Sequence, residues 1–103
     1  MTLIAAHILI VEDSLTQAEQ LKYILASAGY QVSVADSGEQ ALNMLSSVKP
    51  QLVITDIMMP FVGGMEILSY VKNDPIKKHT PVLLISAVGL ENIVLEGFSL
   101  GAD

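Results

Sequence analysis

Three carboxylates and one hydroxyl follow short apolar runs of the chain, and they are the side chains with the clearest chemical potential. Glu12 and Asp13 come after the first run, Asp56 after the third and Ser86 after the fourth. Each of them alone could be a loop residue or a helix cap. Carboxylates that lie close together repel one another, and proton uptake or a bound cation relieves that repulsion.

The ligand types of this set indicate which cation would suit it. Carboxylate oxygens without histidine or cysteine favour a hard ion, and Mg²⁺ commonly binds through one or two carboxylates while keeping several waters. A carboxylate beside the ion, such as Asp56, can be a nucleophile toward phosphorus. A hydroxyl such as that of Ser86 can donate to a phosphoryl oxygen. The residues therefore predict magnesium-dependent phosphoryl transfer, provided that the fold brings them together.

Four short segments are predicted to be strands. Ile8–Val11 and Val82–Ile85 are apolar throughout, as strands buried on both faces are, and Leu52–Thr55 is apolar up to its last residue. Tyr30–Ala35 alternates apolar and polar residues, which favours a strand nearer the edge of a sheet. The carboxyl ends of parallel strands share one rim of the sheet, where ligands of such folds bind.

Helix signals separate the predicted strands. Ser14 with Gln17, and Ser37 with Gln40, have capping-box spacing, and Gly29 is placed to end the first helix. Two further helices are predicted from apolar residues at helical spacing: Met65–Val71, ended by Asp74–Pro75, and Leu90–Phe98, ended near Gly101. Strands that alternate with helices predict an α/β fold, with a parallel sheet and helices on both faces.

Length and charge limit the functions that are compatible with the chain. The 103 residues form one domain, and their net charge of −6 without any arginine disfavours direct nucleic-acid binding. The longest apolar stretch, Leu3–Val11, is well short of the ~20 residues of a membrane span. The first basic residue is Lys22, which does not fit a signal peptide. A cytoplasmic domain with no membrane contact is expected.

Four ordered stretches carry a resemblance to a known family. They are ILIVEDS (Ile8–Ser14), VITDIMMPFVGGMEIL (Val53–Leu68), PVLLISA (Pro81–Ala87) and GFSLGAD (Gly97–Asp103). Together they resemble the receiver domain of bacterial two-component response regulators. The resemblance implies a flavodoxin-like doubly wound parallel sheet of order 2-1-3-4, with residues 1–103 forming the receiver domain.

The resemblance also implies roles for the residues at the strand ends. Asp56 would accept a phosphoryl group from a histidine kinase or phosphotransfer protein. Asp13 would bind Mg²⁺ directly, Glu12 would act mainly through a metal-bound water, and the backbone carbonyl of Met58 would be a further ligand. Ser86 would be the switch hydroxyl that turns toward the phosphoryl group.

Neighbouring residues would support this chemistry. By the same resemblance, Ala87 would leave room for the switch, and Pro60 and Gly64 would shape the loop after the acceptor. Met58 and Val88 stand where the family borders the path of the hydrolytic water. Both are apolar and cannot position a water by hydrogen bonding, so we expect slow self-dephosphorylation. Such a domain is not an enzyme in the ordinary sense, because it acts only on its own modification.

The family pattern continues into a fifth strand and a fifth helix, which this chain is expected to lack. The fifth strand ends near a lysine that pairs with the acceptor, and none of the five lysines here takes that place. Lys72, Lys77 and Lys78 are interpreted as solvated surface. We therefore expect lower stability, slow or absent phosphorylation, and self-association through the open edge of the fourth strand. Residues 88–100 are a predicted surface for a downstream effector.

Three other functions compete with this interpretation. A receiver-like interaction module that is never phosphorylated would not bind Mg²⁺. An aspartate-nucleophile phosphohydrolase commonly has a second acid two residues after the nucleophile, where Met58 stands. A flavin-binding domain would need a phosphate-binding loop after the first strand, and Glu12 and Asp13 would repel that phosphate.

Overall fold

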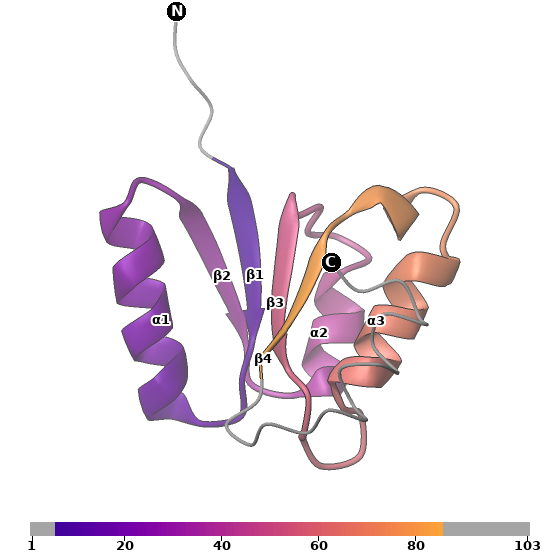
Figure 1. The fold of residues 1–103 in the computed structure, drawn as a ribbon, viewed down its shortest axis with the longest axis horizontal. Helices are drawn as coiled ribbons and strands as arrows, with labels where there is room; N and C mark the ends of the chain where they lie inside the picture. The colour runs from indigo at the N-terminus through magenta and orange to yellow at the C-terminus, as the bar shows by residue number, and fades with distance from the viewer. Residues whose placement is uncertain (1–5, 86–103) are drawn as a thin grey trace, which may run out of the picture.

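The sheet is parallel and has the predicted strand order. The computed structural model describes residues 6–85, in which four strands lie in the order β2-β1-β3-β4 (Figure 1). The strands are β1 (His7–Val11), β2 (Gln31–Ala35), β3 (Leu52–Asp56) and β4 (Val82–Ile85). All the pairings are parallel, with β1 beside both β2 and β3. The predicted fold class is therefore confirmed.

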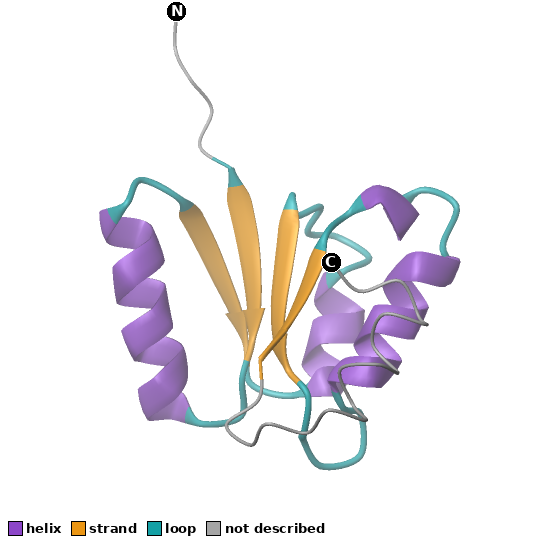
Figure 2. Cartoon of the chain, in the orientation of Figure 1, coloured by secondary structure: helices purple, strands orange, loops and turns teal. Residues whose placement is uncertain are grey.

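Helices cover both faces of the sheet. The helix α1 (Leu15–Ser27) lies on one face, and α2 (Gly38–Met44) and α3 (Gly64–Asn73) lie on the other (Figures 1 and 2). A short 3₁₀ helix, η1 (Lys77–His79), precedes β4 and was not predicted from the sequence. Among residues 6–85, no helix has the length and apolar character needed to span a membrane. The predicted helix at 90–98 lies outside the described residues.

The predicted helix caps are present. The Ser14 hydroxyl accepts a hydrogen bond from the Gln17 amide at 3.4 Å, and the Ser37 hydroxyl accepts one from the Gln40 amide at 3.1 Å. Gly29 follows the end of α1 with φ = +97°, a conformation that glycine adopts without steric cost. These local signals fix where α1 and α2 begin, and thereby how the chain leaves β1 and β2.

The core has one half on each face of the sheet. Against α1 lie buried Ile8, Ile10 and Ile54, packed with partly buried Leu21 and Leu25. The larger half lies under α2 and α3, and its buried residues are Leu9, Val11, Ala35, Ala41, Leu45, Val53, Ile67, Leu68, Val71 and Val82. Because β1 and β3 carry buried residues on both faces, they form the fixed centre from which the functional residues project.

The prediction that β4 is buried on both faces is wrong. Val82 is fully buried, but Leu83 is 41% exposed and Ile85 is 42% exposed. These two residues alternate with the buried positions, so one face of the strand is open. The physical reason is that α1 packs against β2 and β1, at the opposite side of the sheet from β4.

The interpretation of Lys72 and Lys77 as solvated surface also needs correction, whereas Lys78 is exposed. The Lys72 ammonium donates to the carbonyl oxygens of Thr80 at 2.9 Å and Lys78 at 3.3 Å. Lys77 forms an ion pair with Asp74 at 3.5 Å. After α3 ends, the chain folds back as η1 and brings carbonyl groups within reach of Lys72. Two lysines thus hold the connection between α3 and β4.

Candidate functional site: three carboxylates at the carboxyl ends of β1 and β3

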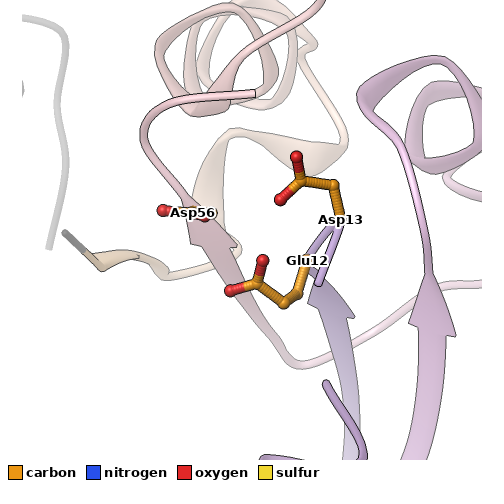
Figure 3. A group of neighbouring side chains, drawn as sticks. All are labelled: Glu12, Asp13 and Asp56. Atoms are coloured by element: carbon orange, nitrogen blue, oxygen red, sulfur yellow. The ribbon is translucent and has the colours of Figure 1, made fainter. Parts of the chain in front are cut away.

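The sheet brings the predicted acidic residues together. In the β1–β3 pair, Val11 lies opposite Thr55, so Glu12 and Asp56 leave adjacent strands at the same rim. One carboxylate oxygen from each of Glu12, Asp13 and Asp56 lies within 4.8 Å of the other two. Figure 3 shows the Glu12 and Asp13 side chains beside the end of β3, where Asp56 lies. The predicted convergence of these three side chains is confirmed.

Glu12 is held in place by the turn that begins α1. Its amide donates to the Ala35 carbonyl of β2 at 3.1 Å, which continues the ladder past the end of β1. Its carboxylate accepts a hydrogen bond from the Ser14 amide at 3.0 Å. Asp13 lies between these two residues and is exposed. Asp13 is therefore the carboxylate with the freest access to solvent and to an entering ion.

Asp56 is positioned through its backbone on both sides. The Thr55 side chain is fully buried, and its hydroxyl donates to the Asp56 carbonyl at 3.0 Å. The next amide, that of Ile57, donates to the Ile85 carbonyl of β4 at 3.0 Å. Sequence reasoning did not assign this role to Thr55. The sequence feature that could have indicated this role is a threonine at the end of an otherwise aliphatic strand, immediately before the acidic residue.

The electrostatics of the cluster favour a cation. Burial raises the pKa of Glu12, and the neighbouring Asp13 and Asp56 carboxyls raise it as well, whereas the hydrogen bond from Ser14 acts in the opposite direction. Raising the pKa of an acid means that the folded protein disfavours its charged form. A divalent ion would relieve this cost, because it replaces repulsion between the carboxylates with attraction.

The donor set fits Mg²⁺ in type and in size. The three groups offer oxygen ligands only, as this ion prefers. Two oxygens bound to one Mg²⁺ lie at most ~4.2 Å apart, given bonds of about 2.1 Å. The observed limit of 4.8 Å is close to this separation, so small side-chain rotations, or a water between one carboxylate and the ion, would complete the site.

The loop after Asp56 is closely packed at one end and exposed at its tip. The Gly64 amide donates to the Ile57 carbonyl at 2.9 Å, and a Cβ atom on Gly64 would overlap the Asp56 carbonyl oxygen. At the tip, Met58 is 67% exposed, and Phe61 is 91% exposed with φ = +66°. Gly64 thus sets how closely α3 approaches the acidic cluster.

Gly38 is a second glycine at this rim whose role sequence reasoning missed. A Cβ atom there would overlap the Val62 carbonyl oxygen and lie 2.6 Å from the Val62 Cβ. The start of α2 therefore supports the loop that follows Asp56. The sequence signal is a glycine directly after the capping serine, where a helix normally tolerates other residues.

Several predicted site residues lie outside the described part of the chain. These are Ser86, Ala87 and Val88, together with the effector surface expected at residues 88–100. Within the described part, Pro60 belongs to the loop that follows Asp56. Met58 belongs to the same loop, and its side chain is exposed.

The fold and the site together define a doubly wound α/β domain with an acidic, oxygen-only pocket where its central strands end. A family model described as the response regulator receiver domain matches residues 8–103. The chain belongs to this family, the receiver domains of two-component systems. The expected family is thereby confirmed.

Similar proteins support the same assignment. The phosphate regulon transcriptional regulatory protein PhoB of Pseudomonas aeruginosa is 31% identical over 101 residues, covering 98% of this chain and 44% of that protein. The response regulator PleD of Caulobacter vibrioides is 33% identical over 99 residues, covering 96% of this chain and 22% of that protein. The chain therefore spans less than half the length of these curated relatives.

Solved structures show the same fold. The signal receiver domain of a signal transduction histidine kinase from Syntrophus aciditrophicus is 39% identical, with a TM-score of 0.87 over 96% of this chain and 75% of that one. A response regulator described as putative from Chloroflexus aurantiacus is 35% identical, with a TM-score of 0.91 over 97% of this chain and 82% of that one. These similarities give no support to the expected self-association through β4.

Proposed function

We propose that the chain accepts a phosphoryl group on Asp56 from a histidine kinase or phosphotransfer protein, in a reaction that depends on Mg²⁺. The phosphorylated form then changes conformation and regulates a partner or an effector. The observation that supports this function best is the convergence of three carboxylates within 4.8 Å at the end of β3. Membership of the receiver family agrees with it.

The proposed transfer is a displacement at phosphorus. A carboxylate oxygen of Asp56 attacks the phosphorus atom, the P–N bond of the donor phosphohistidine breaks, and its electron pair returns to the imidazole nitrogen. Bound Mg²⁺ would offset negative charge on the phosphoryl oxygens during this step. The hydrogen bond from Thr55 and the ladder to β4 keep the Asp56 backbone fixed, so the nucleophile is oriented before the donor arrives.

Each remaining ligand has its own task in this proposal. Asp13 is exposed and would bind the ion directly. Glu12 is held by the Ser14 amide and would act mainly through a metal-bound water. The backbone carbonyl of Met58 would be the further protein ligand. One direct carboxylate beside the nucleophile leaves room for waters, which Mg²⁺ usually retains.

The state of the domain after transfer depends on the residues around the acceptor. The Ser86 hydroxyl turns toward the phosphoryl oxygens, and Ala87 leaves it room. Pro60 and Gly64 hold the loop between β3 and α3 near Asp56. The apolar side chains of Met58 and Val88 do not orient a water for hydrolysis, so the phosphorylated form is long-lived.

The test is incubation of the chain with acetyl phosphate, with and without Mg²⁺, followed by mass spectrometry. We expect the addition of one phosphoryl group only with the metal, and none in the Asp56→Asn variant. A Mg²⁺ titration with beryllofluoride, a phosphoryl mimic, checks binding independently of transfer. If the native chain shows neither labelling nor a beryllofluoride-dependent change, the domain is an interaction module that is not phosphorylated.

A further inference from the structure

A second site lies at the amino ends of β3 and β4, at the far end of the sheet from the acidic cluster. It is a cleft of about 320 Å³ between the end of α2, the end of α3 and η1. We call it the amino-end cleft, and its lining residues are Leu45, Ser46, Val48, Lys49, Pro50, Val71, Ile76, Lys77 and Thr80. In Figure 1 the short helix between α3 and β4 marks its position.

The floor of the cleft is apolar and its rim is open. Leu45 and Val71 are 2% and 0% exposed, and Pro50 is also buried. At the rim, Ile76 is 83% exposed and offers an apolar side chain next to this floor. A cleft of this size with an apolar lining is sufficient to bind an inserted side chain.

The wall formed by η1 is fixed by hydrogen bonds. The Asp74 carboxylate accepts from the amides of Ile76 at 2.8 Å and Lys77 at 3.0 Å. Lys72 donates to the carbonyls of Thr80 and Lys78, as described above. The rim is therefore built before a partner arrives, which lowers the entropy cost of binding.

Positive charge is concentrated around this cleft. Lys49 and Lys77 line it, and Lys72 and Lys78 belong to the segments that form its wall. These are four of the five lysines of a chain whose net charge is −6. The carboxylate bound within this wall, Asp74, is already engaged by Lys77 and by two backbone amides. The cleft thus combines an apolar floor with a basic rim.

We propose that the amino-end cleft binds an acidic segment of a partner protein, which places one apolar side chain in the cleft, over the floor that Leu45 and Pro50 help to form and beside Ile76. Carboxylates on either side of that side chain would face Lys49 and Lys77, and the carboxylate at Lys77 would share its ammonium group with Asp74. A concave apolar floor suits a single inserted side chain better than a flat membrane surface. The absence of arginine and the strongly negative remainder of the chain disfavour nucleic acid. Because Asp56 lies at the other end of the sheet, this binding does not require phosphorylation.

The test uses a fluorescein-labelled synthetic peptide of glutamate and aspartate residues around one central leucine, with binding followed by fluorescence anisotropy. We expect saturable binding that weakens as salt is added. Lys49→Gln should weaken it about 2–5-fold, the range for loss of an exposed ion pair. Lys22→Gln removes the same charge from α1, outside the cleft, and should leave the affinity unchanged.

Two further comparisons separate the apolar contribution from the charge. Ile76→Gln changes an exposed rim residue, so the fold should persist, and thermal melting checks this. It should lower affinity about 5-fold, and replacement of the peptide leucine by glycine should lower it by about 10-fold or more. The proposal is overturned if the peptide does not bind, if Lys22→Gln and Lys49→Gln weaken binding equally, or if anionic phospholipid vesicles bind and the peptide does not.

Discussion

Substitution of Gly64 by alanine should disturb both the stability of the domain and the acidic cluster. Gly64 is buried at the first position of α3, directly behind Asp56. An alanine Cβ would overlap the Asp56 carbonyl oxygen and lie 3.0 Å from both the Asp56 carbonyl carbon and the Ile57 Cα. All three are backbone atoms, so no side-chain rotation can relieve the contact.

The loss of stability in Gly64→Ala depends on which part of the backbone can shift to relieve the overlap. The Asp56 backbone is held by the Thr55 hydroxyl and by the neighbouring bond from Ile57 to Ile85, so α3 must shift instead. Overpacking of this kind costs about 1–3 kcal/mol. The greater helix propensity of alanine offsets less than about 1 kcal/mol of that. We expect a net loss of about 2 kcal/mol, or a Tm lower by about 8–16 °C for a domain of this size.

Urea denaturation measures the loss, and labelling with acetyl phosphate measures its effect on the site. Two glycine variants provide matched controls. Gly63→Ala places a Cβ 2.9 Å from the Ile57 carbonyl oxygen, a milder contact that should cost less. Gly29→Ala meets no atom within 4 Å but forces alanine into φ = +97°, so it should cost about 1 kcal/mol without slowing labelling.

The three glycine variants together show whether Gly64→Ala acts locally on Asp56 or only through the stability of the whole domain. The close approach of α3 to Asp56 predicts that Gly64→Ala alone combines the largest stability loss with slower labelling. If Gly64→Ala unfolds at the same urea concentration as the native chain, the backbone is not packed as described. If all three variants slow labelling in proportion to their stability loss, the effect is global and Gly64 has no special relation to Asp56.

Two further predictions concern charge. Asp13→Asn removes repulsion within the acidic cluster, so in EDTA the variant should be more stable than the native chain by roughly 1 kcal/mol. Added Mg²⁺ should no longer raise the Tm of this variant. A Tm below that of the native chain in EDTA would contradict repulsion among the carboxylates. Hydrogen bonds from the amides of Lys77 and Ile76 hold the pKa of Asp74 below its usual range. The stability that this lowered pKa contributes is present above the ordinary carboxyl pKa and is lost as the pH falls through the lowered value. In urea denaturation at a series of acidic pH values, the free energy of unfolding should therefore fall less steeply with pH in Asp74→Asn than in the native chain.

The fold was predictable because its signals are local. Ser14 and Ser37 cap the helices that they were expected to cap, and the apolar runs of β1 and β3 are buried on both faces. The acidic cluster followed from the same reasoning, because adjacent parallel strands necessarily end at one rim. The prediction of which residues converge therefore depended on the strand order, which the resemblance to a known family implied.

Features that depend on long-range packing were missed. The burial of β4 depends on which helix lies over it, and the short run Val82–Ile85 does not carry that information. Likewise, the sequence around Lys72 carries no signal that would mark this residue as structural. Its role appears only when the chain folds back after Pro75 and brings Thr80 into reach. The amino-end cleft was missed for the same reason.

The separation of charge in this domain follows from its topology. In a parallel α/β fold each helix begins at the carboxyl end of a strand, so the positive ends of the helix dipoles face the rim where carboxylates gather. Glu39 and Glu66 lie in the first turns of α2 and α3, at the rim of the acidic cluster, while Lys72 lies in the last turn of α3. The direction of the strands thus places the acidic cluster and the lysines at opposite ends. A partner bound at the amino-end cleft would therefore leave Asp56 accessible to its phosphodonor.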